Sequence, residues 1–155
     1  METLLTAIIL WLSANFELPA NYEYPRIELA SNSTMRTLYY QNFLLGNRSG
    51  ADATDNKVPD SPRATELVAV YSSVSKTIYL PLGWTGKTPA ELSILVHEMV
   101  HHLQNVGGLK YECPQAREKL AFVAQERWLR MYGTDLEKEF GIDPFSLLVL
   151  SNCGY

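Results

Sequence analysis

The sequence predicts a single α+β domain over residues 1–155, with a short antiparallel sheet packed against helices. The length of 155 residues and the hydrophobic content of 46% are enough for one core. Two stretches, 89–105 and 114–132, carry strong helix signals. Two short stretches, 67–71 and 77–80, are rich in Val, Ile and Tyr, as strands are.

The first element is predicted to be a helix over residues 2–17, which is stopped by Pro19. Its strongest apolar positions follow the spacing of one helix face: Leu4, Leu5, Ile8, Trp11 and Leu12. A signal peptide is the alternative for this apolar run. We favour a buried helix because no lysine or arginine precedes the run and no small-x-small cleavage site follows it. The run is also too short to span a membrane.

The middle of the chain is predicted to form strands and a loop. Residues 26–30 are expected to form a short strand, and residues 37–44 either a second strand or a helical turn. Residues 46–63 are rich in Gly, Asp, Asn, Ser and Pro, which predicts a long surface loop. Residues 67–71 and 77–80 flank a short polar stretch, so they are expected to pair as a hairpin.

A well-capped helix is predicted from Pro89 to about Asn105. Thr88 suits its N-cap, Pro89 its first position and Glu91 its third, which together form a capping box. The pair Gly107-Gly108 ends this helix and lets the next one pack antiparallel to it.

Three more helices are expected in the C-terminal third of the chain. A long one runs from about Pro114 to Tyr132-Gly133. A short one is expected over residues 134–140, and Asp143-Pro144 starts another that reaches about Leu150.

The helix from Pro89 carries the segment His97-Glu98-Met99-Val100-His101, which matches the pattern H-E-x-x-H. Residues four apart lie on one face of a helix, so the two imidazoles can bind one Zn²⁺. Glu98 then lies where it can take a proton from the attacking water. The alternative is a pair of partly buried histidines with ordinary hydrogen bonds. The apolar side chains fall on a different arc, so the histidines lie beside the core face: Leu92, Leu95, Val96, Met99, Val100 and Leu103.

A catalytic zinc normally takes three protein ligands, so a third ligand is needed. His102 is the remaining histidine of the chain, and it points about 100° away from His101. The third ligand is therefore expected to be a carboxylate or, less favourably, Cys113.

The acid that we favour as third ligand is Glu118, on the following helix. It falls at the border of that helix's apolar arc, beside the small Ala121, from where a carboxylate can reach a neighbouring helix. Glu126 falls opposite the arc and is expected to pair with Arg130 in solvent. Glu112 lies in the connection and is less well fixed.

With these residues the chain resembles the gluzincin branch of zinc metallopeptidases. His97-Glu98-x-x-His101 followed by Glu118-x-x-Ala121 is similar to that family's H-E-x-x-H and E-x-x-A patterns. The segments HEMVHHLQ and ECPQAREKLAF are also similar to a set of small uncharacterised bacterial proteins. The resemblance implies a zincin-like domain, in which the sheet packs on the N-terminal, metal-binding and glutamate-bearing helices.

The resemblance also implies where a substrate would lie. The strand Thr77 to Leu80 would be the sheet edge along which an extended peptide pairs. Larger gluzincins use a separate histidine or tyrosine to stabilise the transition state. Candidates for that role, or for supporting a metal ligand, are His102, Tyr111, Tyr132 and Tyr79.

The sequence therefore predicts a zinc-dependent metallohydrolase, in the first place a peptidase acting on peptides or proteins, with Glu98 as general base. A hydrolase acting on another amide is one alternative. A non-catalytic zinc-binding regulatory or interaction module is the other.

The net charge and the two cysteines restrict which binding partners and which cellular compartment we expect. The net charge is −4 and no lysine or arginine cluster is present, so we do not expect nucleic acid as a partner. A Cys113–Cys153 disulfide would indicate a periplasmic or secreted protein, whereas two reduced cysteines would indicate the cytoplasm.

Overall fold

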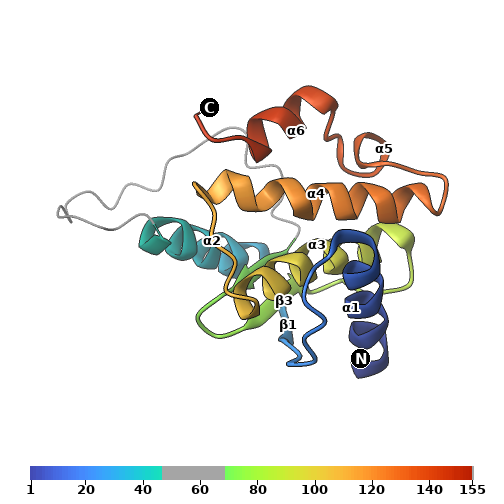
Figure 1. Cartoon of the computed structure of the whole chain (residues 1–155), viewed down its shortest axis with the longest axis horizontal. Coiled ribbons are helices and arrows are strands. Elements are labelled where there is room, and N and C mark those ends of the chain that lie inside the picture. Colours follow the sequence, from blue (N-terminus) through green and yellow to red (C-terminus); the bar gives the residue numbers. More distant parts are fainter. Residues whose placement is uncertain (47–68, 155) are drawn as a thin grey trace.

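The computed structural model describes residues 1–46 and 69–154, and of residues 42–46 only the helical backbone. Within these ranges the chain forms six helices and a three-stranded sheet (Figure 1), so the predicted α+β class is confirmed. The elements are α1 (Glu2–Phe16), β1 (Arg26–Ala30), α2 (Asn32–Gly46), β2 (Val70–Ser72), β3 (Thr77–Pro81), α3 (Pro89–Val106), α4 (Pro114–Arg130), α5 (Leu136–Phe140) and α6 (Pro144–Ser151).

The sheet has the strand order β1-β3-β2 and is mixed. β2 and β3 pair antiparallel, with Tyr71 opposite Ile78, as the hairpin prediction expects. β1 pairs parallel with β3, with Ile27 opposite Ile78, so the prediction of a purely antiparallel sheet is wrong for this pair. β3 is consequently the central strand, and the expectation that Thr77 to Leu80 forms the edge is wrong. In the described sheet the edges belong to β1 and β2.

The helix over 32–46 resolves the ambiguity at residues 37–44 in favour of helix over strand. The Ser31 hydroxyl accepts a hydrogen bond from the Thr34 backbone N–H at 3.3 Å, which caps the first turn. Met35 and Leu38, three residues apart, then pack against β2 and β3 on one side of the sheet. Apart from Gly46, the predicted loop 46–63 lies outside the described residues.

The predicted start of α3 is confirmed. The Glu91 backbone N–H donates to the Thr88 hydroxyl at 3.1 Å, and the Glu91 carboxylate accepts from the Thr88 backbone N–H at 3.3 Å. The same carboxylate accepts from the Thr85 hydroxyl and backbone, and these bonds lower the pKa of Glu91 to about 2. The N-terminus of α3 is therefore tied to the loop before it.

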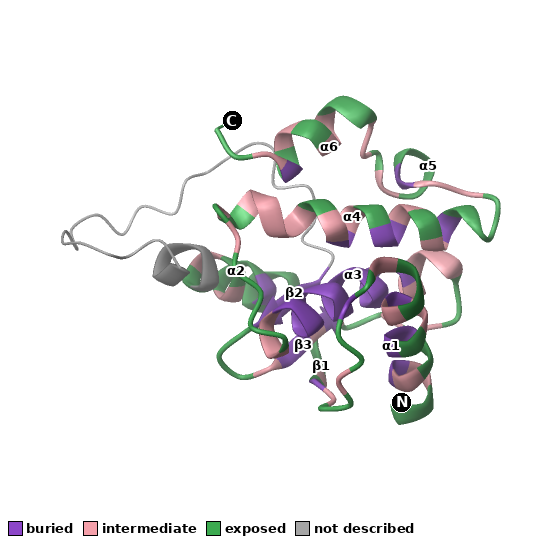
Figure 2. Cartoon of the chain, in the orientation of Figure 1, coloured by how far each residue is buried: buried purple, intermediate pink, exposed green. Residues whose placement is uncertain are grey.

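The core lies between α1, the sheet and α3. Figure 2 shows α3 buried along most of its length and α1 buried on the side that faces it. Leu5, Ile8, Ile9 and Leu12 of α1 are at most 2% exposed, so the amphipathic helix at the start of the chain is confirmed. Side chains from the sheet and from α3 complete this core: Ile78, Leu80, Leu95, Val96, Met99 and Leu103.

Helix α4 packs on the remaining face of α3, and α5 and α6 follow on the other side of α4 (Figure 1). A disulfide joins Cys113, just before α4, to Cys153, just after α6. This bond fixes the C-terminal helices across α4. In the two described ranges, no helix has both the length and the apolar character needed to cross a bilayer.

Candidate metal centre

His97, His101 and Glu118 converge between α3 and α4, as the sequence predicts. Nε2 of His97 lies 3.0 Å from Oε2 of Glu118, and Nε2 of His101 lies 3.2 Å from Oε1. One ligand atom from each residue lies within 4.8 Å of the other two. The side chains of His97 and His101 are 11% and 7% exposed, whereas 35% of the Glu118 side chain is exposed. The three groups therefore meet at one point that opens to solvent on the Glu118 side.

The spacing of these atoms suits a zinc ion. Ligand bonds of about 2.0 to 2.1 Å in a tetrahedral arrangement put ligand atoms about 3.3 Å apart. The three nitrogen-to-oxygen distances of 3.0 to 3.3 Å are close to that spacing. Two imidazole nitrogens and one carboxylate also form the ligand type and number found in catalytic zinc sites.

Two glutamines fix the orientation of the imidazoles. Nδ1 of His97 lies 3.0 Å from Oε1 of Gln125, and Nδ1 of His101 lies 3.0 Å from Oε1 of Gln104. Because an amide oxygen only accepts, each Nδ1 carries a proton, and in the neutral form of each ring Nε2 has the lone pair that a metal would use. The Gln104 amide nitrogen donates to a backbone carbonyl of α4, and that of Gln125 donates to a serine hydroxyl of α3.

The sequence analysis missed both glutamines, although helical spacing contains the signal. Gln104 follows His101 by three residues, and Gln125 follows Glu118 by seven, so each shares a helix face with a candidate ligand. Ala121, between Glu118 and Gln125, is fully buried and lets the two helices approach closely.

The charges of the three groups support one another. Burial alone would raise the pKa of Glu118, but His101 and His97 hold that pKa well below its usual value. Burial alone would lower the pKa of His101, but the Glu118 carboxylate and then Glu98 raise it to about 8. In the metal-free protein at neutral pH, His101 is therefore an imidazolium paired with an ionised Glu118.

Glu98 lies on the neighbouring face of α3, which turns toward β2. It is 7% exposed, and its carboxylate accepts a hydrogen bond from the Tyr71 backbone N–H. Burial raises the pKa of Glu98, although His97 and His101 oppose this. A carboxylate with a raised pKa beside a candidate metal centre suits a group that accepts and returns a proton.

Two of the predicted supporting tyrosines, Tyr79 and Tyr132, have their described ring and packing contacts away from the cluster. Tyr79 lies on the face of β3 that turns to α2, because its neighbours Ile78 and Leu80 face α3. Tyr132 is 54% exposed beyond the end of α4, about 20 Å along the helix axis from Glu118.

The other two predicted supporting residues lie nearer. Tyr111 is hydrogen-bonded to Gln104, the residue that orients His101. His102 is fully buried on the β2 side of α3, with Nδ1 on the Tyr71 hydroxyl and Nε2 on the Glu23 backbone carbonyl. Both His102 nitrogens thus point away from the Glu118 side of α3, so His102 is not a third ligand.

The other residues considered as ligands in the sequence do not belong to the cluster. Cys113 is in the disulfide. Glu126 pairs with Arg130 at 2.6 Å, as predicted, and also accepts from the Leu136 backbone N–H. Glu112 is exposed and is not in the cluster.

Tyr39 of α2 is a neighbour of the cluster that the sequence analysis missed. Burial raises its pKa, and the negative charge of Glu118 raises it further. The sequence does not decide between a strand and a helical turn for residues 37–44, so it relates no helix face there to Glu118.

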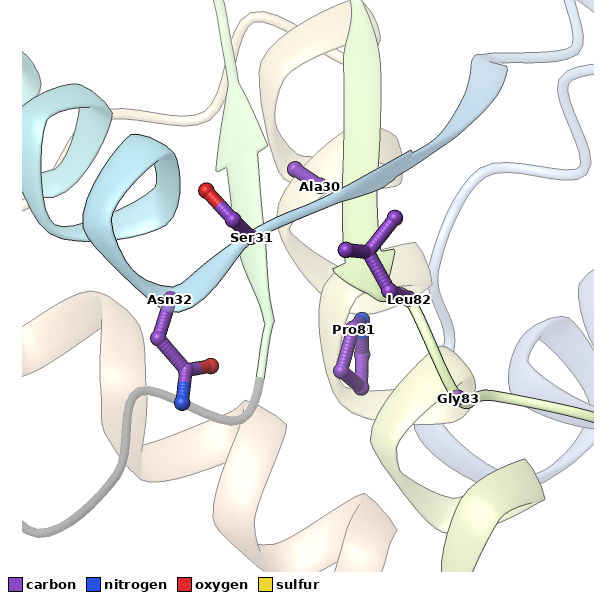
Figure 3. A pocket seen from close by; sticks show the side chains of 6 residues that line it. All are labelled: Ala30, Ser31, Asn32, Pro81, Leu82 and Gly83. Atoms are coloured by element: carbon purple, nitrogen blue, oxygen red, sulfur yellow. The ribbon is translucent and has the colours of Figure 1, made fainter.

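A surface pocket of about 310 Å³ lies elsewhere, at the C-terminal ends of β1 and β3 (Figure 3). It is lined by Ala30, Ser31, Asn32, Pro81, Leu82 and Gly83. None of these is a residue of the metal cluster, so the pocket is separate from the candidate centre.

Fold and site together define a small α+β domain with a candidate metal centre between two packed helices. The chain belongs to the family described as "Domain of unknown function (DUF6647)", which matches residues 1–154. The comparisons with curated proteins and with solved structures found no match.

Proposed function

We propose that this protein is a zinc-dependent metallohydrolase that cleaves peptide bonds. The observation that carries the proposal is the convergence of two imidazole nitrogens, each with its Nδ1–H held by a glutamine, on the Glu118 carboxylate, beside a buried Glu98. The residues that would hold zinc are His97, His101 and Glu118.

Zinc bound there would lower the pKa of a water molecule and polarise the substrate carbonyl. Glu98 then acts as general base and takes a proton from the attacking water. It returns that proton to the leaving amine as the carbon–nitrogen bond breaks. The raised pKa of Glu98 brings it closer to the operating pH, which favours both transfers.

A peptide substrate is supported by the position of β2 at the edge of the described sheet. β2 is an edge strand of the described sheet, and its Tyr71 N–H reaches Glu98. An extended peptide that lay along this side of β2 would run next to the general base, whose carboxylate accepts from the Tyr71 N–H. We assign the role of substrate-binding edge strand to β2 instead of β3, because β3 is the central strand of the sheet.

The first test is the substitution Glu98→Gln, compared with Glu112→Gln in the exposed connection. With zinc loaded and peptide mixtures followed by mass spectrometry, Glu98→Gln should keep the metal and lose activity by roughly 10²- to 10⁴-fold. Glu112→Gln should match the wild type. Undiminished turnover in metal-replete Glu98→Gln refutes the general-base role, and zinc binding without hydrolysis in the wild type favours a regulatory zinc module.

The second test addresses the ligand set. Glu118→Gln should weaken zinc binding strongly, whereas Glu126→Gln should leave it unchanged because Glu126 pairs with Arg130. Equal zinc affinity in the two variants would exclude Glu118 as a ligand.

The disulfide supports an oxidising compartment, and we propose that the protein acts in the periplasm or outside the cell. Thiol labelling of protein taken directly from its native source tests this. Full labelling of Cys113 and Cys153 before reduction would place the protein in a reducing compartment.

A further inference from the structure

Tyr71 lies in the middle of β2. It is 7% exposed and faces the stripe of α3 formed by Glu98, His102 and Asn105. These three positions are separated by four and three residues, so they form one helix face, next to the face that carries His97.

The backbone N–H of Tyr71 is directed away from β3, the strand with which β2 pairs. The Arg26 N–H donates to the Lys76 carbonyl, so the peptide groups of residues 76 and 78 turn toward β1. Peptide groups alternate along a strand, so those of residues 77 and 79 turn toward β2, where Tyr79 pairs with Val70. The Tyr71 N–H therefore turns away from β3, and it donates to the Glu98 carboxylate.

The side chain of Tyr71 is held by the same helix. The Glu23 carbonyl can only accept, so Nε2 of His102 donates to it, and Nδ1 of the neutral ring accepts from the Tyr71 hydroxyl at 3.2 Å. The Tyr71 oxygen accepts from the Asn105 amide at 3.0 Å, and the same amide donates to the Ser73 carbonyl at 3.3 Å. Every donor in this chain has an acceptor.

We propose that Tyr71 is the positioning residue of Glu98. His102 and Asn105 anchor its hydroxyl on α3, which holds the β2 backbone so that the Tyr71 N–H fixes the Glu98 carboxylate in the orientation needed for proton transfer. The inference rests on the proposed function, because it assigns a role within that reaction. The contact between Tyr71 and Glu98 does not involve the metal ligands, because Glu98, His102 and Asn105 lie on a different face of α3 from the one that packs on α4.

The test in activity compares Tyr71→Phe with Tyr24→Phe. Tyr24 is a matched control because its hydroxyl also makes a part-buried hydrogen bond, with Thr6 at 2.6 Å, but on α1. Tyr71→Phe should lower kcat by about ten- to a hundredfold with KM within about twofold, because small misplacements of a catalytic group have effects of that size. Zinc content should stay at the wild-type level, and Tyr24→Phe should keep its kcat. Equal kcat losses in the two variants, or loss of zinc from Tyr71→Phe, would overturn the proposal.

The test in structure needs no activity and uses the amide of residue 71 in ¹⁵N-labelled protein. Glu98→Ala should move its proton resonance upfield and speed its exchange at least tenfold, because the carboxylate acceptor is gone. Asn105→Ala should also speed this exchange, whereas Tyr24→Phe should not. An amide that does not respond to Glu98→Ala overturns the proposal. If the wild type hydrolyses nothing, the proposed function fails while the amide result still decides whether Tyr71 holds Glu98.

Discussion

Zinc affinity should depend steeply on pH, because the metal competes with a proton on His101. A histidine binds zinc only in its neutral form. The Glu118 carboxylate, against the effect of burial, raises the pKa of His101 to about 8, so at neutral pH the free protein holds a proton where the metal would bind. Glu118 itself has a lowered pKa and stays ionised between pH 6 and 8.5, so it adds no slope there.

The size of the effect follows from that pKa. At pH 7 about one molecule in ten has a neutral His101, and at pH 6 about one in a hundred, given a pKa of about 8. The apparent affinity should therefore fall about tenfold, or about 1.4 kcal/mol, for each pH unit below 8, and level off above about 9. Lowering the pH should therefore weaken zinc binding.

The assay is competition against a chelating dye whose own pH dependence is known, from pH 6 to 9. Calorimetry in two buffers of different ionisation enthalpy should show close to one proton released per zinc at pH 6.5 and almost none above pH 9. Glu118→Gln supplies the control, because without the carboxylate burial lowers the His101 pKa and the fall in affinity moves to lower pH. An affinity that is constant between pH 6 and 8 in the wild type would refute the reasoning.

Three other outcomes are expected. In the zinc-free protein, the pKa of His101 is about 8 in the folded state against about 6.5 for an unperturbed histidine, so its ion pair stabilises the fold fully below about pH 6.5. Thermal unfolding should show that contribution, on the order of 2 kcal/mol, disappear as pH rises through 8, and an unchanged melting temperature would contradict it. Gln104→Ala and Gln125→Ala should each weaken zinc binding about ten- to a hundredfold, measured by the same dye competition, because each frees an imidazole to rotate. Reducing Cys113–Cys153, which closes a loop of 40 residues, should lower the free energy of unfolding by about 4 kcal/mol, whereas equal chemical denaturation curves with and without a phosphine reductant would contradict this.

The helices other than α2 could be predicted because their signals are local. Thr88, Pro89 and Glu91 give the start of α3, and both its first residue and its capping box are as expected. His97 and His101 are four residues apart, so the formation of that helix is enough to place them on one face. Glu118 could be chosen because a helical wheel places it at the border of the apolar arc, beside Ala121, and the structure brings it to both rings.

The site's supporting contacts could not be predicted because they join elements that are distant in sequence. Gln125 lies 28 residues from His97, and the hydroxyl of Tyr71 lies 31 residues from His102. A polar side chain at the right helical spacing has many available partners, and only the packing of α4 and β2 on α3 selects one.

The sequence by itself determined the described helices other than α2 and the set of candidate metal-binding groups, because helix periodicity and capping depend on neighbours within a turn. The tertiary structure alone decided that β1 pairs parallel with β3, which makes β3 internal and places β2 at the edge of the described sheet, next to Glu98. Strand pairing is a contact between distant segments, and a five-residue strand does not specify its partner. For the same reason, only the fold could show that Glu98 meets a backbone N–H of that edge.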